Sequence, residues 1–144
     1  MCCQNPLLFN KEIKMKVELF ADKECWEFKE RFPNEFESYG CGPGGIGDFL
    51  VPDTVYGLSI KEACRIHDWG YRHCKLASEE DRARHDRIFL NNMLRIVNAK
   101  TNLYILRQLR AYRCYAYYIA VRKFGGRAYW SERNNNEDLG VVNV

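Results

Sequence analysis

Hydrophobic residues recur with a helical period over three long stretches of the chain. From Ser59 to Met93, two apolar stripes follow each other and predict two amphipathic helices. The first stripe consists of Ile60, Ala63, Cys64, Gly70, Tyr71 and Cys74, and the second of Ala83, Phe89, Leu90, Met93 and Val97. After a break at residues 99–102, a third helix is predicted over Leu103 to Phe124, ended by two glycines. The pattern therefore predicts an all-α fold.

Each of the first two helices has its own start signal. Ser59 with Glu62 fits a capping box, and Ser78 with Asp81 resembles one. The link between the helices is therefore short, near residues 76–78. Because short links join antiparallel neighbours, we expect the two helices to pack side by side in opposite directions.

Two polar residues, His67 and Asp86, lie inside the apolar stripes. They are equally far from a link centred between Leu76 and Ala77, so they should meet across the helix interface. Tyr71 is one turn from His67 and can donate its hydroxyl to the same carboxylate. A buried histidine paired with a buried acid is a common structural device as well as a catalytic one, so these residues alone leave both interpretations open.

Shorter elements are predicted around these helices. Alternating residues over Lys11 to Phe20 indicate a half-exposed strand or an extended arm. Asp22 to Phe32 is typical of a short helix that ends before Pro33. The inner face of this helix would hold Cys25, Trp26, Phe28 and Phe32. The core-facing side of the third long helix would hold Leu106, Leu109, Tyr117, Ala120, Val121 and Phe124.

Length and composition predict one domain over residues 1–144, with its core at 20–130 and flexible tails at 1–10 and 131–144. Charged residues are 28% of the chain and the net charge is +3, so no nucleic-acid partner is expected, although the third helix interleaves basic residues with tyrosines. The chain has no apolar run of the roughly 20 residues that a membrane span needs, and no signal-peptide region, so we expect a cytoplasmic protein as synthesised. The seven cysteines are scattered and lack a C-x-x-C pair, which indicates mainly reduced thiols.

A glycine-rich loop, Y-G-C-G-P-G-G-I-G-D-F at residues 39–49, precedes the histidine helix. Glycines allow carbonyl oxygens to turn toward one point and bind a cation, but the same loop can present N–H groups to an anion or form a tight structural turn. Asp68 is about 100° around the helix from His67, so it can point to a different wall and bind a cation held by the loop.

Three motifs, C-G-P-G-G, A-C-R-I-H-D-W-G-Y and H-D-R-I-F, occur in this order and resemble the secreted phospholipase A2 superfamily, most closely its compact bacterial and phage-borne type. The resemblance implies a calcium loop, two antiparallel helices that carry the His/Asp pair, and a third long helix. It implies calcium-dependent hydrolysis of a glycerophospholipid acyl ester at a phospholipid membrane surface. The alternative is a non-catalytic phospholipase A2-like protein that keeps the fold as a binding or structural module.

Site residues follow from this resemblance. Catalysis is assigned to His67 as general base, Asp86 as the residue that orients it, Tyr71 as support for Asp86, and the N–H of Gly42 as oxyanion donor. Calcium is assigned to Asp68 and to the carbonyls of Gly40, Gly42 and Gly44.

The resemblance also implies a disulfide between Cys41 and Cys64. A second bridge of the family falls at Gly70 and His85, where both cysteines are absent, yet the two positions should still be neighbours. A zinc hydrolase built on His67, His85 and Cys64 is a further interpretation, although no standard zinc-ligand spacing is present.

Overall fold

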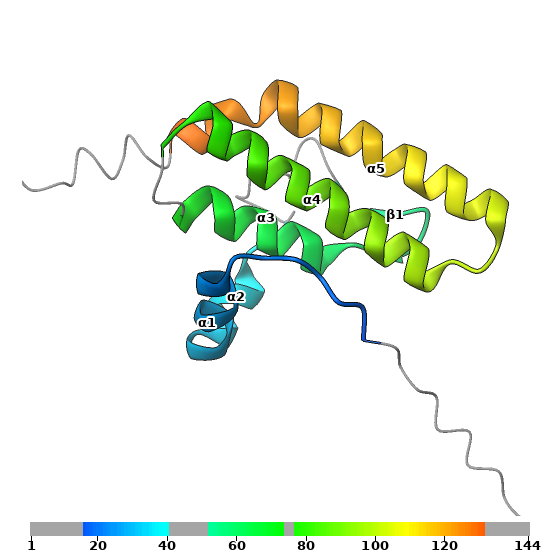
Figure 1. Ribbon diagram of the computed structural model, residues 1–144, viewed down its shortest axis with the longest axis horizontal. Coiled ribbons are helices and arrows are strands. Elements are labelled where there is room, and N and C mark those ends of the chain that lie inside the picture. The colour runs from blue at the N-terminus through cyan, green and yellow to red at the C-terminus, as the bar shows by residue number, and fades with distance from the viewer. Residues whose placement is uncertain (1–15, 41–51, 74–76, 132–144) are drawn as a thin grey trace, which may run out of the picture.

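The computed structural model describes residues 16–40, 52–73 and 77–131. These residues form helices α1 (Lys23–Arg31), α2 (Pro33–Ser38), α3 (Lys61–His73), α4 (Glu79–Lys100) and α5 (Tyr104–Phe124), and strands β1 (Thr54–Val55) and β2 (Leu58–Ser59). The fold is mostly helical, as predicted. Helix α4 packs against both α3 and α5, and Figure 1 shows these three long helices side by side, with α1 and α2 beside α3.

The start of α4 agrees with the sequence pattern, and the start of α3 does not. Ser78 caps α4, because its side-chain oxygen accepts a hydrogen bond of 3.1 Å from the backbone N–H of Asp81. Ser59 instead belongs to β2 and pairs with Thr54 of β1, so α3 begins only at Lys61. The capping box at Ser59 was therefore a wrong prediction, because sheet pairing takes up this segment.

The β1–β2 hairpin was not predicted from the hydrophobic pattern. Its turn consists of Tyr56 and Gly57, which both have positive φ angles, 44° and 75°. Two positive φ angles in succession suit a tight two-residue hairpin. Helix α5 holds the hairpin in place, since the Tyr117 hydroxyl donates to the carbonyl oxygen of Thr54 and Arg110 donates to that of Tyr56.

The segment before α3 was predicted only in part. Helix α1 ends at Arg31, before Pro33 as predicted. Pro33 then begins α2, which was not predicted, and its missing N–H is tolerated at a first helical position. Phe32, predicted inside, has 45% of its surface exposed. Phe36 of α2 is fully buried instead, in a cluster with Cys25 and Trp69.

Residues 16–20 form the arm that was one of two predictions for this segment. Asn92 of α4 holds the arm at Phe20, where it accepts from the backbone N–H over 2.8 Å and donates to the carbonyl over 2.7 Å. Exposure alternates along the arm, and Val17 and Leu19 pack against the core. No strand pairs with these residues in the described part of the chain.

Helix α5 has the predicted bounds within one residue, but part of its predicted inner face was wrong. Cys114, Tyr117 and Val121 are buried against the core. Leu109 and Phe124 were predicted inside, yet 48% and 61% of their surfaces are exposed. The reason is that α5 carries apolar residues on both sides, so periodicity alone does not select one.

Of the predicted tails at 1–10 and 131–144, only Ser131 is described, and its hydroxyl donates to the carbonyl oxygen of Ala128 over 3.0 Å. The other tail residues and the link residues 74–76 lie outside the described residues. Among the helices that the structure describes, none is both long enough and apolar enough to cross a membrane.

Candidate active site

The centre of the site is a buried contact between α3 and α4. His67 Nε2 lies 2.7 Å from Asp86 Oδ1, and the Tyr71 hydroxyl donates to the same oxygen over 2.6 Å. The predicted meeting of these three side chains is therefore confirmed. Because the carboxylate accepts from Nε2, the neutral imidazole carries its proton there, and Nδ1 is its basic nitrogen. The ring is also packed against Phe89, with ring centroids 4.7 Å apart.

A residue from the third long helix completes this contact, and the sequence analysis missed it. Arg122 Nη1 of α5 donates to the second carboxylate oxygen, Asp86 Oδ2, over 2.7 Å, and Arg82 Nη1 lies 3.5 Å from that oxygen. The position of Arg122 also follows from the antiparallel geometry of neighbouring helices. A link centred on Asn102 puts Arg122 beside Arg82, one turn before Asp86.

Close hydrogen bonds keep Asp86 ionised although it is fully buried. Burial alone would raise the pKa of this carboxyl, but the hydrogen bonds from His67, Tyr71 and Arg122 outweigh burial and hold the pKa below its ordinary value. Burial and the neighbouring carboxylate together raise the pKa of the Tyr71 phenol, so that hydroxyl remains a donor. Asp86 is thus a fixed negative charge behind the imidazole of His67.

Asp68 of α3 is a further buried carboxylate, and its surroundings differ from those of Asp86 of α4. Its two contacts with described residues are long, 3.3 Å from Arg72 Nε to Oδ1 and 3.4 Å from the Gly40 nitrogen to Oδ2. Burial raises the pKa of Asp68, and the attraction of Arg72 and the Gly40 hydrogen bond offset only part of this effect. Among the described residues, Asp68 is therefore a buried carboxylate with a single ion pair, to the partly exposed Arg72, and a cation ligand could take the place of that pair.

The glycine loop reaches the site through Gly40. This residue has a φ of 143°, which favours glycine, and its N–H donates to Asp68. The predicted donors Gly42 and Gly44 lie outside the described residues, and the structure does not report on them. The described part of the predicted calcium site is thus one carboxylate beside the start of the loop.

Cys64 is disulfide-bonded, while Cys25 and Cys114 are free and buried. Cys41, the predicted disulfide partner of Cys64, lies outside the described residues. A cysteine in a disulfide has no thiolate to offer, so Cys64 does not fit the zinc interpretation. The described residues also contain no group of three histidine, cysteine or acidic side chains that could hold a metal ion.

Gly70 and His85 lie in contact, as predicted. A Cβ atom at Gly70 would be only 2.6 Å from Cε1 and 2.8 Å from Cγ of the His85 ring. The imidazole therefore packs directly on the backbone of α3. Where the resembled family has a second disulfide, this chain has a close glycine–histidine contact between α3 and α4.

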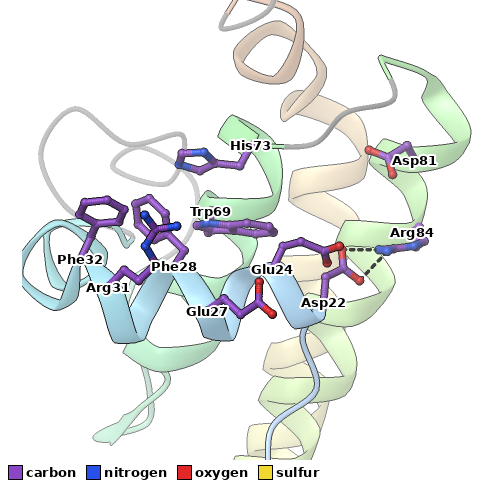
Figure 2. Close-up of a pocket in the computed structure, with 10 residues that line it drawn as sticks. All are labelled: Asp22, Glu24, Glu27, Phe28, Arg31, Phe32, Trp69, His73, Asp81 and Arg84. Carbon is purple, nitrogen blue, oxygen red and sulfur yellow. Dashed lines mark hydrogen bonds and ion pairs between the residues drawn. The ribbon is translucent and has the colours of Figure 1, made fainter.

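A pocket of about 480 Å³ lies beside the site, between α1, α3 and α4 (Figure 2). Phe28, Trp69 and His73 line it, together with Asp22, whose carboxylate binds Arg84 across 2.6 Å. Neither His67 nor Asp68 lines this pocket. It is therefore separate from the buried His67–Asp86 contact.

No protein-family model, curated protein or solved structure matches the chain.

Proposed function

We propose that the protein is a calcium-dependent phospholipase A2-type hydrolase that cleaves an acyl ester of a glycerophospholipid. The observation that carries this proposal is the contact of His67 Nε2 with the ionised carboxylate of Asp86, which leaves Nδ1 as the basic nitrogen. The order of the three sequence motifs supports the same assignment.

In the proposed reaction, His67 Nδ1 takes a proton from water while the water oxygen forms a bond to the ester carbonyl carbon. The imidazolium that results lies against the negative charge of Asp86, which stabilises it, and Tyr71 and Arg122 keep that carboxylate in place. The proton then passes to the alcohol oxygen as the ester bond breaks. The N–H of Gly42 is the proposed donor to the carbonyl oxygen as it becomes negative.

Calcium, when bound, would polarise the ester carbonyl and neutralise the developing oxyanion. Asp68 would hold it, with the carbonyls of Gly40, Gly42 and Gly44 as the proposed further ligands. Support comes from the burial of Asp68 and from the length of both its contacts. Arg72 would have to release Asp68, and its side chain has 33% of its surface exposed, so it can turn toward water.

Fatty-acid release from mixed phospholipid vesicles tests the proposal. We expect release that requires calcium and that falls by at least about 100-fold in His67→Gln. His73→Gln is the matched control, because it makes the same change on the same helix and should retain activity. Equal release in calcium and in chelator, or equal release by His67→Gln and the parent, would contradict the proposal.

The second candidate, a non-catalytic protein with the same fold, is favoured by one contact. Arg72 supplies Asp68 with a positive charge from the chain itself. Calorimetry with calcium separates the candidates. Calcium binding that Asp68→Asn abolishes, together with vesicle hydrolysis, supports the enzyme, whereas absence of both supports the binding or structural protein.

A further inference from the structure

The outward side of α5 exposes an unusual amount of apolar surface. Among the large apolar side chains that are exposed in the described part of the chain, eight of eleven lie between Leu103 and Phe124. Ile105 in the first turn of α5 and Tyr112 near its middle have 68% and 75% of their surfaces exposed. Contiguous apolar surface of this kind marks interaction sites on soluble proteins.

Five of the outward residues form a regular stripe, which we call the α5 seam. The seam consists of Ile105, Leu109, Tyr112, Ala116 and Ile119. The steps between them are four, three, four and three residues, which is the spacing of the contact positions in a coiled coil. The buried residues Cys114, Tyr117 and Val121 are on the other side of the helix. The seam covers about 21 Å of helix at 1.5 Å per residue.

Charge distinguishes the partners that could cover the seam. Helix α5 has five basic residues and no acidic one. Three of the five are bonded to other parts of the protein, namely Arg107, Arg110 and Arg122. Only Arg113 and Lys123 are left to flank the seam. An anionic lipid surface attracts helices with many free basic side chains, so this nearly uncharged stripe fits an apolar helix better.

We propose that the seam pairs with the α5 seam of a second copy of this chain, in an antiparallel arrangement. The same stripe then serves both copies, as a two-fold interface requires. In the antiparallel register that sets Leu109 of one copy against Ile119 of the other, the large Tyr112 meets the small Ala116, which fills space evenly. A parallel pair would instead oppose tyrosine to tyrosine and Lys123 to Lys123. This inference does not depend on catalysis.

Sedimentation equilibrium of the full chain tests the pairing. We expect a mass approaching twice the 17.0 kDa of one chain as the concentration rises. Leu109→Glu and, independently, Ile119→Glu should weaken dimerisation by roughly 100-fold or more, since each change occurs twice in the interface. Tyr104→Glu is the matched control, because it replaces an exposed residue of the same helix off the seam and should leave the dimer intact.

Three results would overturn the inference. One is a monomeric parent up to the solubility limit, and another is dimers of unchanged stability in both seam variants. The third is a monomer that binds vesicles of mixed neutral and anionic phospholipid and loses that binding in Leu109→Glu, which would assign the seam to lipid. Circular dichroism of each variant verifies that α5 is folded, and using two seam positions covers the case that one variant does not fold.

Discussion

Replacing Arg122 by methionine should destabilise the fold measurably, because Arg122 holds a buried charge. Asp86 is fully buried, and its Oδ2 accepts from Arg122 over 2.7 Å. Without Arg122, the nearest described cation to this oxygen is Arg82 at 3.5 Å, beyond ordinary hydrogen-bond length. Methionine keeps the apolar part of the side chain and the helix propensity, so the change isolates the guanidinium.

The expected loss is about 2 kcal/mol, the usual cost of removing a hydrogen bond to a buried charged group. For a domain of 144 residues, this corresponds to a fall in Tm of about 6 °C. Differential scanning calorimetry at neutral pH measures the shift. Arg113→Met is the matched control, since it makes the same change on the same helix at a side chain exposed to solvent, and its Tm should stay that of the parent.

A double-mutant cycle with Asp86→Asn tests the cause. If the loss comes from the Arg122–Asp86 contact, Arg122→Met should cost much less in the Asp86→Asn background than in the parent. The reasoning is refuted if Arg122→Met is no more destabilising than Arg113→Met, or if the two changes at the contact are additive.

Two further predictions concern the same helix interface. Gly70→Ala should reduce the free energy of unfolding by about 1–3 kcal/mol, because its Cβ would meet the His85 ring. Gly126→Ala is the control, since its nearest atom would be at an ordinary 3.8 Å, and equal losses in chemical denaturation would contradict this explanation. The second prediction concerns acid. Because the pKa of Asp86 is lowered in the native state, the native state binds fewer protons than the unfolded state. The contribution of Asp86 to the free energy of unfolding is therefore present above about pH 4, the ordinary pKa of an aspartate, and is lost as the pH falls through the native pKa. Denaturant titrations from neutral to acidic pH should show that the free energy of unfolding falls less for Asp86→Asn than for the parent. If the free energy of unfolding depended on pH equally in both proteins, this role of Asp86 would be ruled out.

Much of the helical framework follows from local pattern. Helices α4 and α5 begin and end close to the predicted residues, because Ser78 is a real cap and Gly125 ends α5. The contact of His67 with Asp86 could also be predicted, since a short link between antiparallel helices makes residues at equal distance from it neighbours.

The tertiary structure decided the features for which the pattern was ambiguous. Helix α5 is apolar on both sides, so only its packing on α4 selects Tyr117 for the core and leaves Leu109 in solvent. Ser59 could cap a helix or pair in a strand, and α5 selects the strand by holding the hairpin that contains it. From the sequence, Arg122 is one of several basic residues interleaved with tyrosines in the third helix, and only the packing of α5 directs it to Asp86. Sequence by itself therefore determined the helical segments of α1, α3, α4 and α5, and which polar residues face each other across one short link. The rotation of each helix about its axis depended on contacts between distant segments, which local periodicity does not contain.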